Sequence, residues 1–231
     1  TNVSHDLKTP LTAIITYVNL LKEPGITNQE REEYVQVLER KSLRLKALIE
    51  DLFEVSKANS QTMKLNLMEV DVVSLMKLEL SEQLSDSGVD FRFQLPEKRV
   101  ALTLDSEKTY RIFENLLVNI AKYGMPGTRA YVEIEETGMP EADEGGAASE
   151  AGENRENRGE VRISMKNISA SELPKDAGEL TGRFVRGDQS RNTEGSGLGL
   201  AIVKSFVELQ KGSFQVETEA DLFKAVIVWK K

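Results

Sequence analysis

The chain has 231 residues, no cysteine, one histidine and a net charge of −8, from 30 basic and 38 acidic residues. Without cysteine it has no disulfide, thiolate zinc site or thiol nucleophile, and one histidine excludes a multi-histidine metal site. The acidity argues against a general nucleic-acid-binding or anionic-membrane-binding protein. No apolar run approaches the roughly 20 residues of a membrane helix. The first residues show no signal peptide, and a helical pattern of apolar residues is already under way there. We therefore expect the chain to be a piece of a longer protein.

Two amphipathic helices are predicted in the first 60 residues. Apolar residues recur every three or four positions over 3–21, and a heptad-like spacing follows over 38–55. Pro24 ends the first helix, and Thr27 or Asn28 caps the second. A single antiparallel hairpin cannot bury its apolar stripe on all sides. We therefore expect two chains to form a four-helix bundle, as a homodimer.

From residue 61 the pattern alternates between strands and helices. The predicted strands are 65–71, 91–95, 100–104, 130–136, 161–167, 214–218 and 223–229, and the predicted helices are 72–84, 105–123 and 198–210. This order predicts an α+β fold whose mixed sheet is covered by helices on one face. Residues 138–159 are rich in Gly, Glu, Ala and Asn, which favours a mobile solvated loop, with a partner-binding insert as the alternative.

The single histidine, His5, lies two residues after Val3 and thus about 200° around the helix from it, away from the apolar stripe. The carboxylate of Asp6 beside it can raise the basicity of the imidazole and accept the proton it loses, as a nucleophile requires. Thr9, one turn on, shares that face and can position a water. Pro10 leaves the Asp6 carbonyl without its usual donor and favours a kink beside His5. The alternative is an ordinary solvated helix face with one histidine.

A polar strip crosses the apolar helix predicted at 105–123. Asn115, Asn119 and Lys122 stand at i, i+4 and i+7, opposite an apolar side that ends at Tyr123. An amide oxygen is a hard neutral ligand suited to Mg²⁺, and a lysine one turn further suits a phosphate. Because asparagine is disfavoured inside helices, the presence of two asparagines in this helix requires an explanation. Ligand binding and structural hydrogen bonds are the two explanations.

A glycine-rich stretch at 194–199 immediately precedes the last predicted helix. Its glycines let backbone N–H groups approach a polyphosphate, and the helix N-terminus favours negative charge. No strand leads directly into it and no lysine-serine pair follows it, so neither a dinucleotide-binding turn nor a Walker loop is indicated. A tight turn without a ligand is the alternative.

Taken in order, these motifs resemble the sensor histidine kinases of two-component signalling, over nearly the whole chain. Residues 5–11 resemble the H-box, 115–123 the N-box, 184–188 the F-box and 195–199 the glycine-rich G2 box. The resemblance implies an N-terminal helical hairpin over 1–60 that forms a dimeric four-helix bundle for dimerisation and histidine phosphotransfer. It implies a Bergerat-type α/β sandwich that binds ATP over 61–231, with 138–159 as a flexible insert.

The resemblance also implies roles. His5 would accept the γ-phosphoryl group of ATP with the help of Asp6, and Thr9 would orient water when the protein acts as a phosphatase. The partner would be the receiver domain of a response regulator, phosphorylated on an aspartate. The chain would be the cytoplasmic part of a membrane-anchored bacterial sensor, in contact with a membrane only through a missing N-terminal sensor region.

For the nucleotide, the resemblance implies that Asn119 binds Mg²⁺ and that Lys122 contacts a phosphate of ATP. The other positions that it assigns to nucleotide binding are Asn115, Tyr123, Asn167, Arg191, Gly195, Gly197, Leu198 and Gly199.

One motif departs from the family. Its usual Asp-x-Gly-x-Gly box, whose aspartate accepts a hydrogen bond from the adenine amino group, is replaced here by Asn167, Ser169 and Ser171. Asn167 has the strand parity of the apolar residues at 161–165 and is expected to point into the same interior. We expect weaker affinity for ATP and weaker discrimination against GTP.

Two other classes of protein remain open as alternatives. A gyrase-like ATPase shares the Bergerat sandwich, but it needs no hairpin carrying a phosphoacceptor such as His5. A kinase-like dimeric scaffold, or a phosphatase-dominant protein with impaired nucleotide binding, is supported by Asn167 alone.

Overall fold

The structure is a computed structural model that describes residues 3–60, 63–83, 88–137, 159–174, 177–181 and 197–231. The expected insert up to residue 158, the F-box at 184–188, and the candidates Arg191 and Gly195 lie outside the described residues. Within the described ranges, no helix combines the length and the apolar character needed to cross a membrane.

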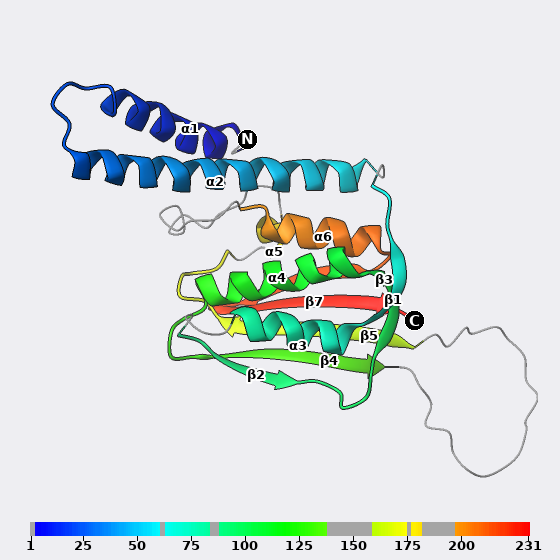
Figure 1. Cartoon of the computed structure of the whole chain (residues 1–231). Helices are drawn as coiled ribbons and strands as arrows, with labels where there is room; N and C mark the ends of the chain where they lie inside the picture. The colour runs from blue at the N-terminus through cyan, green and yellow to red at the C-terminus, as the bar shows by residue number, and fades with distance from the viewer. Residues whose placement is uncertain (1–2, 61–62, 84–87, 138–158, 175–176, 182–196) are drawn as a thin grey trace, which may run out of the picture.

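The N-terminal region is a hairpin of two long helices, as predicted. Helix α1 (Val3–Leu20) packs along helix α2 (Asn28–Asn59), and Figure 1 shows the pair above the rest of the molecule. Thr27 caps α2: its hydroxyl oxygen accepts the Glu30 N–H at 3.2 Å, and its own N–H donates to the Glu30 carboxylate at 2.8 Å. This reciprocal cap satisfies two backbone donors and fixes where the helix begins.

Both hairpin helices keep large apolar side chains on their surface. Leu43 and Phe53 are each 61% exposed. The exposed apolar residues of the hairpin are Leu11, Ile15, Val18, Val35, Leu43, Ile49 and Phe53. A single chain therefore leaves much of the hairpin's apolar surface in water, which is unfavourable unless another surface covers it.

The rest of the chain is built on a five-stranded mixed sheet of order β2-β4-β5-β7-β6. Its strands are β2 (Asp90–Gln94), β4 (Arg129–Thr137), β5 (Glu160–Ile168), β6 (Ser213–Glu219) and β7 (Leu222–Lys230). Strand β2 pairs parallel with β4, and every other pair is antiparallel. Helices α3 (Val72–Gln83), α4 (Ser106–Tyr123) and α6 (Gly199–Leu209) cover one face (Figure 1), which confirms the α+β fold. Helix α5 (Ala177–Thr181) is a short turn beside α6.

Two predicted strands form a separate small sheet. Strand β1 (Leu67–Asp71) pairs antiparallel with β3 (Ala101–Asp105), and Val70 lies opposite Leu102. The predicted mixed sheet thus contains five of the seven strands, because β2 and β3, although neighbours in sequence, pair with different partners.

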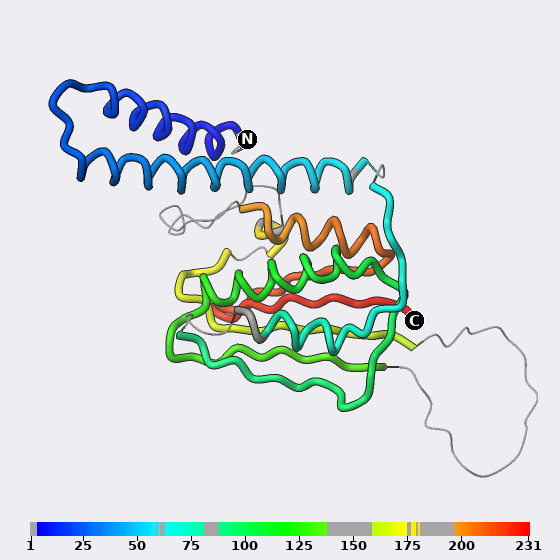
Figure 2. Tube along the Cα trace, in the orientation of Figure 1, coloured from blue at the N-terminus to red at the C-terminus, as the bar shows by residue number. Residues whose placement is uncertain are grey.

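The end of α2 belongs to the core of the sandwich. Val55 and Ala58 of α2 are buried in the same cluster as Phe113 of α4 and Phe206 of α6. Figure 2 shows α2 running between α1 and α6. The C-terminal end of α2 thus packs on the layer of helices that covers the sheet.

Candidate nucleotide and phosphotransfer site

Helix α4 presents the predicted polar strip. The Asp105 carboxylate caps the helix by accepting the Lys108 N–H at 3.1 Å. Its apolar side is buried and consists of Ile112, Phe113, Leu116, Leu117 and Ile120. Asn115, Asn119 and Lys122 are half-buried on the other side. Tyr123, expected on the buried side, is only half-buried because it ends the helix.

Asn115 joins the N-box helix to the glycine-rich segment. Its side-chain N–H donates to the Arg111 carbonyl at 2.7 Å, which fixes the amide. The amide oxygen points at Gly199, where a Cβ would lie only 2.9 Å from it. A larger first residue of α6 would require the Asn115 amide to shift, so two motifs 84 positions apart in sequence meet here.

The described part of the glycine-rich segment is a turn that starts α6. Gly197 has φ +65°, in the left-handed region that glycine adopts without strain. Leu198 is the N-cap residue, and its side chain is fully buried in the core. Leu198 is one of the predicted nucleotide-binding positions. Because its side chain is buried, only its backbone N–H and carbonyl groups can contact a ligand.

The far end of α4 meets the segment that replaces the aspartate box. The Tyr123 carbonyl accepts the Ala170 N–H at 2.8 Å, and Gly124 forms an isolated bridge with Ser169. The Lys122 ammonium lies 5.0 Å from the centroid of the Tyr123 ring, a cation–π distance. Three of the sequence-predicted clusters thus converge on one helix.

Asn167 is buried as its strand parity predicted, with 4% of its surface exposed. Its side-chain N–H donates to the Ile168 carbonyl at 3.1 Å, and the Met125 N–H donates to the same carbonyl at 2.8 Å. This use of Nδ2 leaves the amide oxygen able to accept a hydrogen bond. In the described residues 169–174 that follow, no φ is positive, and the Ser169 hydroxyl accepts the Ser171 N–H at 3.2 Å.

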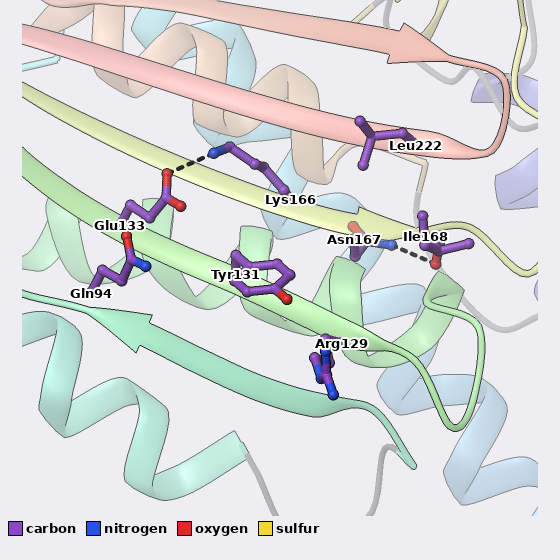
Figure 3. A pocket seen from close by; sticks show the side chains of 8 residues that line it. All are labelled: Gln94, Arg129, Tyr131, Glu133, Lys166, Asn167, Ile168 and Leu222. Atoms are coloured by element: carbon purple, nitrogen blue, oxygen red, sulfur yellow. Dashed lines mark hydrogen bonds and ion pairs between the residues drawn. The ribbon is translucent and has the colours of Figure 1, made fainter.

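A pocket of about 380 Å³ opens on the other face of the sheet (Figure 3). Its lining residues are Gln94, Arg129, Tyr131, Glu133, Lys166, Asn167, Ile168 and Leu222. Apart from Asn167, these residues share the strand parity opposite to the helix-covered face. Lys166 donates to Glu133 at 2.7 Å and holds the pKa of that carboxyl below its ordinary value. Among the eight described lining residues, Asn167 is the one that the sequence also assigned to the predicted site.

His5 lies apart from these motifs. Its side chain is 80% exposed, and its Nδ1 is 3.6 Å from an Asp6 carboxylate oxygen, an ion-pair distance longer than a hydrogen bond. The Thr9 hydroxyl donates to the His5 carbonyl at 3.0 Å. Helix α1 lies on the side of α2 away from α6 (Figure 2). The structure therefore brings together described residues that the sequence predicted to bind nucleotide, namely Asn115, Tyr123 and Gly199, but within one chain it does not bring His5 to them.

Sequence reasoning gave Arg111 no role. It lies one turn before Asn115 on α4, and its guanidinium contacts Asp51 and Glu54 of α2. No local pattern could reveal these partners, which are about 60 positions away. The only signal was an arginine beside an otherwise apolar stretch.

Comparisons with known proteins agree with this arrangement. A family model described as "His Kinase A (phospho-acceptor) domain" matches residues 1–61. A second, "Histidine kinase-, DNA gyrase B-, and HSP90-like ATPase", matches residues 104–230, more than half of the chain. The chain is 30% identical over 224 residues to Sensor protein VanSC of Enterococcus gallinarum, covering 94% of this chain and 56% of that protein. It is 27% identical over 222 residues to Sensor histidine kinase WalK of Bacillus subtilis, covering 94% of this chain and 33% of that one.

The chain thus spans between a third and just over half of the length of these relatives. Among solved structures, the fold is similar to the Acinetobacter baumannii histidine kinase AdeS, with a TM-score of 0.66 and 16% identity over 98% of this chain and 97% of that one. It is also similar to ShkA, with a TM-score of 0.64 and 20% identity over 98% of this chain and 44% of that one. With a phospho-acceptor hairpin placed before an ATPase sandwich, this chain belongs to the sensor histidine kinases of two-component systems.

Proposed function

We propose that this protein transfers the γ-phosphoryl group of ATP to His5 and then passes it to an aspartate in the receiver domain of a response regulator. The observation that carries the proposal is the convergence of the nucleotide motifs on α4, through the Asn115–Gly199 and Tyr123–Ala170 contacts. The same chain offers one exposed imidazole beside a carboxylate. The domains we propose are a phosphotransfer hairpin over 1–60 and an ATP-binding sandwich over 61–231.

The geometry at His5 suits a nucleophile. With Nδ1 turned toward the Asp6 carboxylate, the lone pair of Nε2 is free to face solvent. Attack by Nε2 on the γ-phosphorus would form a P–N bond while the bond from that phosphorus to the β–γ bridging oxygen breaks, and ADP leaves. The nearby carboxylate would stabilise the positive charge that develops on the ring and favour the Nδ1–H tautomer.

The residues present fit a magnesium ion shared with the triphosphate. Asn119 is half-buried on the polar side of α4, and its side chain makes no hydrogen bond with another described residue. An amide oxygen suits Mg²⁺, which usually takes few protein ligands and completes its shell with phosphates and water. When bound, the ion would neutralise charge on the phosphate oxygens. Asn115 and Lys122 would orient the triphosphate, and Tyr123 would border the nucleotide.

The exposed apolar surface of the hairpin supports a homodimer. The described part of the chain leaves residues such as Leu43 and Phe53 exposed, whereas a second hairpin would bury them in a four-helix bundle. The longer relatives, whose names call them sensors, support a further proposal. In it, this chain is the cytoplasmic part of a membrane-anchored bacterial sensor.

A phosphatase activity toward the regulator is a second proposed function. Thr9 is exposed one turn from His5, and its hydroxyl hydrogen is directed to the His5 carbonyl. Its oxygen lone pairs therefore remain able to accept a hydrogen from water and orient that water toward an aspartyl phosphate.

Incubation with γ-³²P-labelled ATP tests the proposal. We expect label that is stable in alkali and labile in acid, and its loss in His5→Gln with nucleotide binding unchanged. Since His5 is the only histidine, label that persists in this variant contradicts the assignment. ATP hydrolysis without protein labelling would favour a gyrase-like ATPase. Absence of both, with a folded dimer, would favour a scaffold.

A further inference from the structure

The pocket on the uncovered face of the sheet has no role in the proposed phosphotransfer. Its volume is about 380 Å³, and its walls come from β2, β4, β5 and the start of β7 (Figure 3). Helices α3, α4 and α6 lie on the other face of the sheet (Figure 1), so the sheet separates the pocket from the polar strip of α4. A cavity of a few hundred Å³ suits a small organic molecule.

One part of the pocket wall is apolar. Ile168 and Leu222 stand opposite each other in the pair of β5 with β7, and both are half-buried. On the neighbouring strand β4, the half-buried ring of Tyr131 lies on the same face (Figure 3). These three side chains keep part of their apolar surface in water, and the body of a ligand would cover it favourably.

One end of the pocket carries an unpaired positive charge. Arg129 is exposed at the start of β4, and its side chain forms no ion pair or hydrogen bond with another described residue. Its cross-strand neighbour is Asp90, but that carboxylate is bound by Arg92 at 2.6 Å. A guanidinium offers N–H donors in a planar fork that matches a carboxylate. The Arg129 end of the pocket therefore favours an anion.

The other end of the pocket carries a negative charge. Glu133 lies four residues after Arg129 on β4, so their Cα atoms are about 13 Å apart. Its Oε2 accepts hydrogen bonds from Lys166 at 2.7 Å and Ser164 at 2.9 Å, and neither bond uses Oε1. The free oxygen can accept a hydrogen bond from a ligand, whereas a second negative charge on the ligand would be repelled.

We propose that this pocket binds a small organic anion with a flat apolar body, a carboxylate at the Arg129 end and a hydrogen-bond donor at the Glu133 end. The body would lie against Tyr131, Ile168 and Leu222. Because the pocket and the polar strip of α4 lie on opposite faces of the sheet, the sandwich would hold this ligand in addition to ATP.

The simplest probe with this pattern is 4-hydroxybenzoate. In protein with ¹³C-labelled methyl groups, it should shift the signals of Ile168 and Leu222 and leave Ile163, which is 1% exposed on the covered face, unchanged. A ligand of about ten non-hydrogen atoms should bind with a Kd of about 1 mM. The neutral 4-hydroxybenzamide should bind several-fold more weakly. Terephthalate, which replaces the hydroxyl by a second carboxylate, should also bind more weakly.

Two variants test the two ends of the pocket separately. Arg129→Gln should weaken binding of 4-hydroxybenzoate about fivefold and change binding of the amide little. The matched control is Arg162→Gln, because Arg162 is exposed on the same face of β5 but does not line the pocket. Glu133→Gln removes the repulsion, so terephthalate should then bind as well as 4-hydroxybenzoate or better.

The methyl shifts should persist when a non-hydrolysable ATP analogue and Mg²⁺ saturate the protein. Competition between probe and analogue would overturn the proposal, because it would make the pocket part of the nucleotide site. Absence of shifts at concentrations far above the expected Kd would also overturn it. So would equal binding of the acid and its amide, or equal losses in Arg129→Gln and Arg162→Gln.

Discussion

Gly199 and Asn115 touch at the point where helix α6 starts beside helix α4, and a Cβ on Gly199 would lie 2.9 Å from the Asn115 amide oxygen. The amide cannot easily retreat, because its nitrogen donates to the Arg111 carbonyl at 2.7 Å. The position of the Asn115 side chain on α4 therefore depends on the size of the first residue of α6.

Gly199→Ala should therefore weaken nucleotide binding. The new methyl group would displace Asn115 and break a hydrogen bond that contributes about 1 kcal/mol, which corresponds to several-fold in affinity. The measurement is nucleotide affinity by calorimetry in the single variants and in Gly199→Ala/Asn115→Ala. Once the asparagine side chain is gone, the alanine should cost little more, so fully additive losses would contradict this explanation.

Thr9→Val should reduce dephosphorylation of the phosphorylated regulator by about tenfold or more and change autophosphorylation less. Valine keeps the shape of the side chain and loses the hydroxyl that can accept a hydrogen from water. The rates of both reactions are measured with purified regulator. Thr9→Ser should retain activity, and Thr16→Val is the matched control, because Thr16 makes the same type of hydroxyl–carbonyl bond to Thr12. Equal losses in both reactions would indicate damage to the helix.

Asn119→Ala should slow phosphorylation of His5 by roughly a hundredfold, the effect of losing one good metal or charge contact in a transition state. It should also raise the Mg²⁺ concentration needed for half-maximal rate. Asn119→Asp retains an oxygen ligand and should lose less. A wild-type rate in Asn119→Ala, measured by labelling over a Mg²⁺ titration, would remove this residue from the site.

Local patterns predicted most elements because their causes are local. The cap of α2 follows from Thr27 and Glu30, three positions apart, and the polar strip of α4 follows from helical spacing. The parity of β5 predicted correctly that Asn167 is buried. In each case the interacting residues lie within one element or one turn.

The relationships between elements could not be predicted in this way. The pairing of β1 with β3, outside the five-stranded sheet, joins two strands that α3 and β2 separate in sequence. The contact of Arg111 with Asp51 joins residues 60 positions apart, and each would be an ordinary surface charge in its own helix. Such contacts are set by the packing of whole elements, which periodicity does not encode.

The ion pair of Glu133 with Lys166 should make stability depend on pH. The pKa of Glu133 is lowered by the hydrogen bond from Lys166. The pair's contribution is therefore fully present above the unfolded pKa, about 4.3, and is lost as pH falls through the lower folded pKa. Glu133→Gln should cost about 1 kcal/mol in the free energy of unfolding at pH 7 and much less near pH 3. Urea unfolding at both values checks this, with exposed Glu135→Gln on the same strand as the control; an equal cost at both values would exclude the ion pair as its cause.

The last prediction concerns Asn167, which stands where the family has aspartate. Its buried amide can accept a hydrogen bond from the adenine amino group and donate to the neighbouring ring nitrogen, and a flipped amide can serve guanine. We therefore expect weak ATP binding together with a measurable GTP reaction.

A carboxylate at this position accepts hydrogen bonds only, so Asn167→Asp should sharpen the preference for ATP by repelling the guanine O6. The structure indicates that this substitution would also reduce the stability of the fold. The Asn167 N–H now donates to the Ile168 carbonyl, which a buried carboxylate would instead face without a donor between them. Asn167→Asp should therefore lower the free energy of unfolding by about 1–3 kcal/mol while it improves selectivity.

Binding of both nucleotides is measured alongside thermal unfolding, and Asn167→Ala separates the two effects, because it removes the local hydrogen bond without adding a charge. If Asn167→Asp is less stable but its ratio of ATP to GTP affinity equals that of the wild type, Asn167 stabilises the end of β5 and does not contact the base.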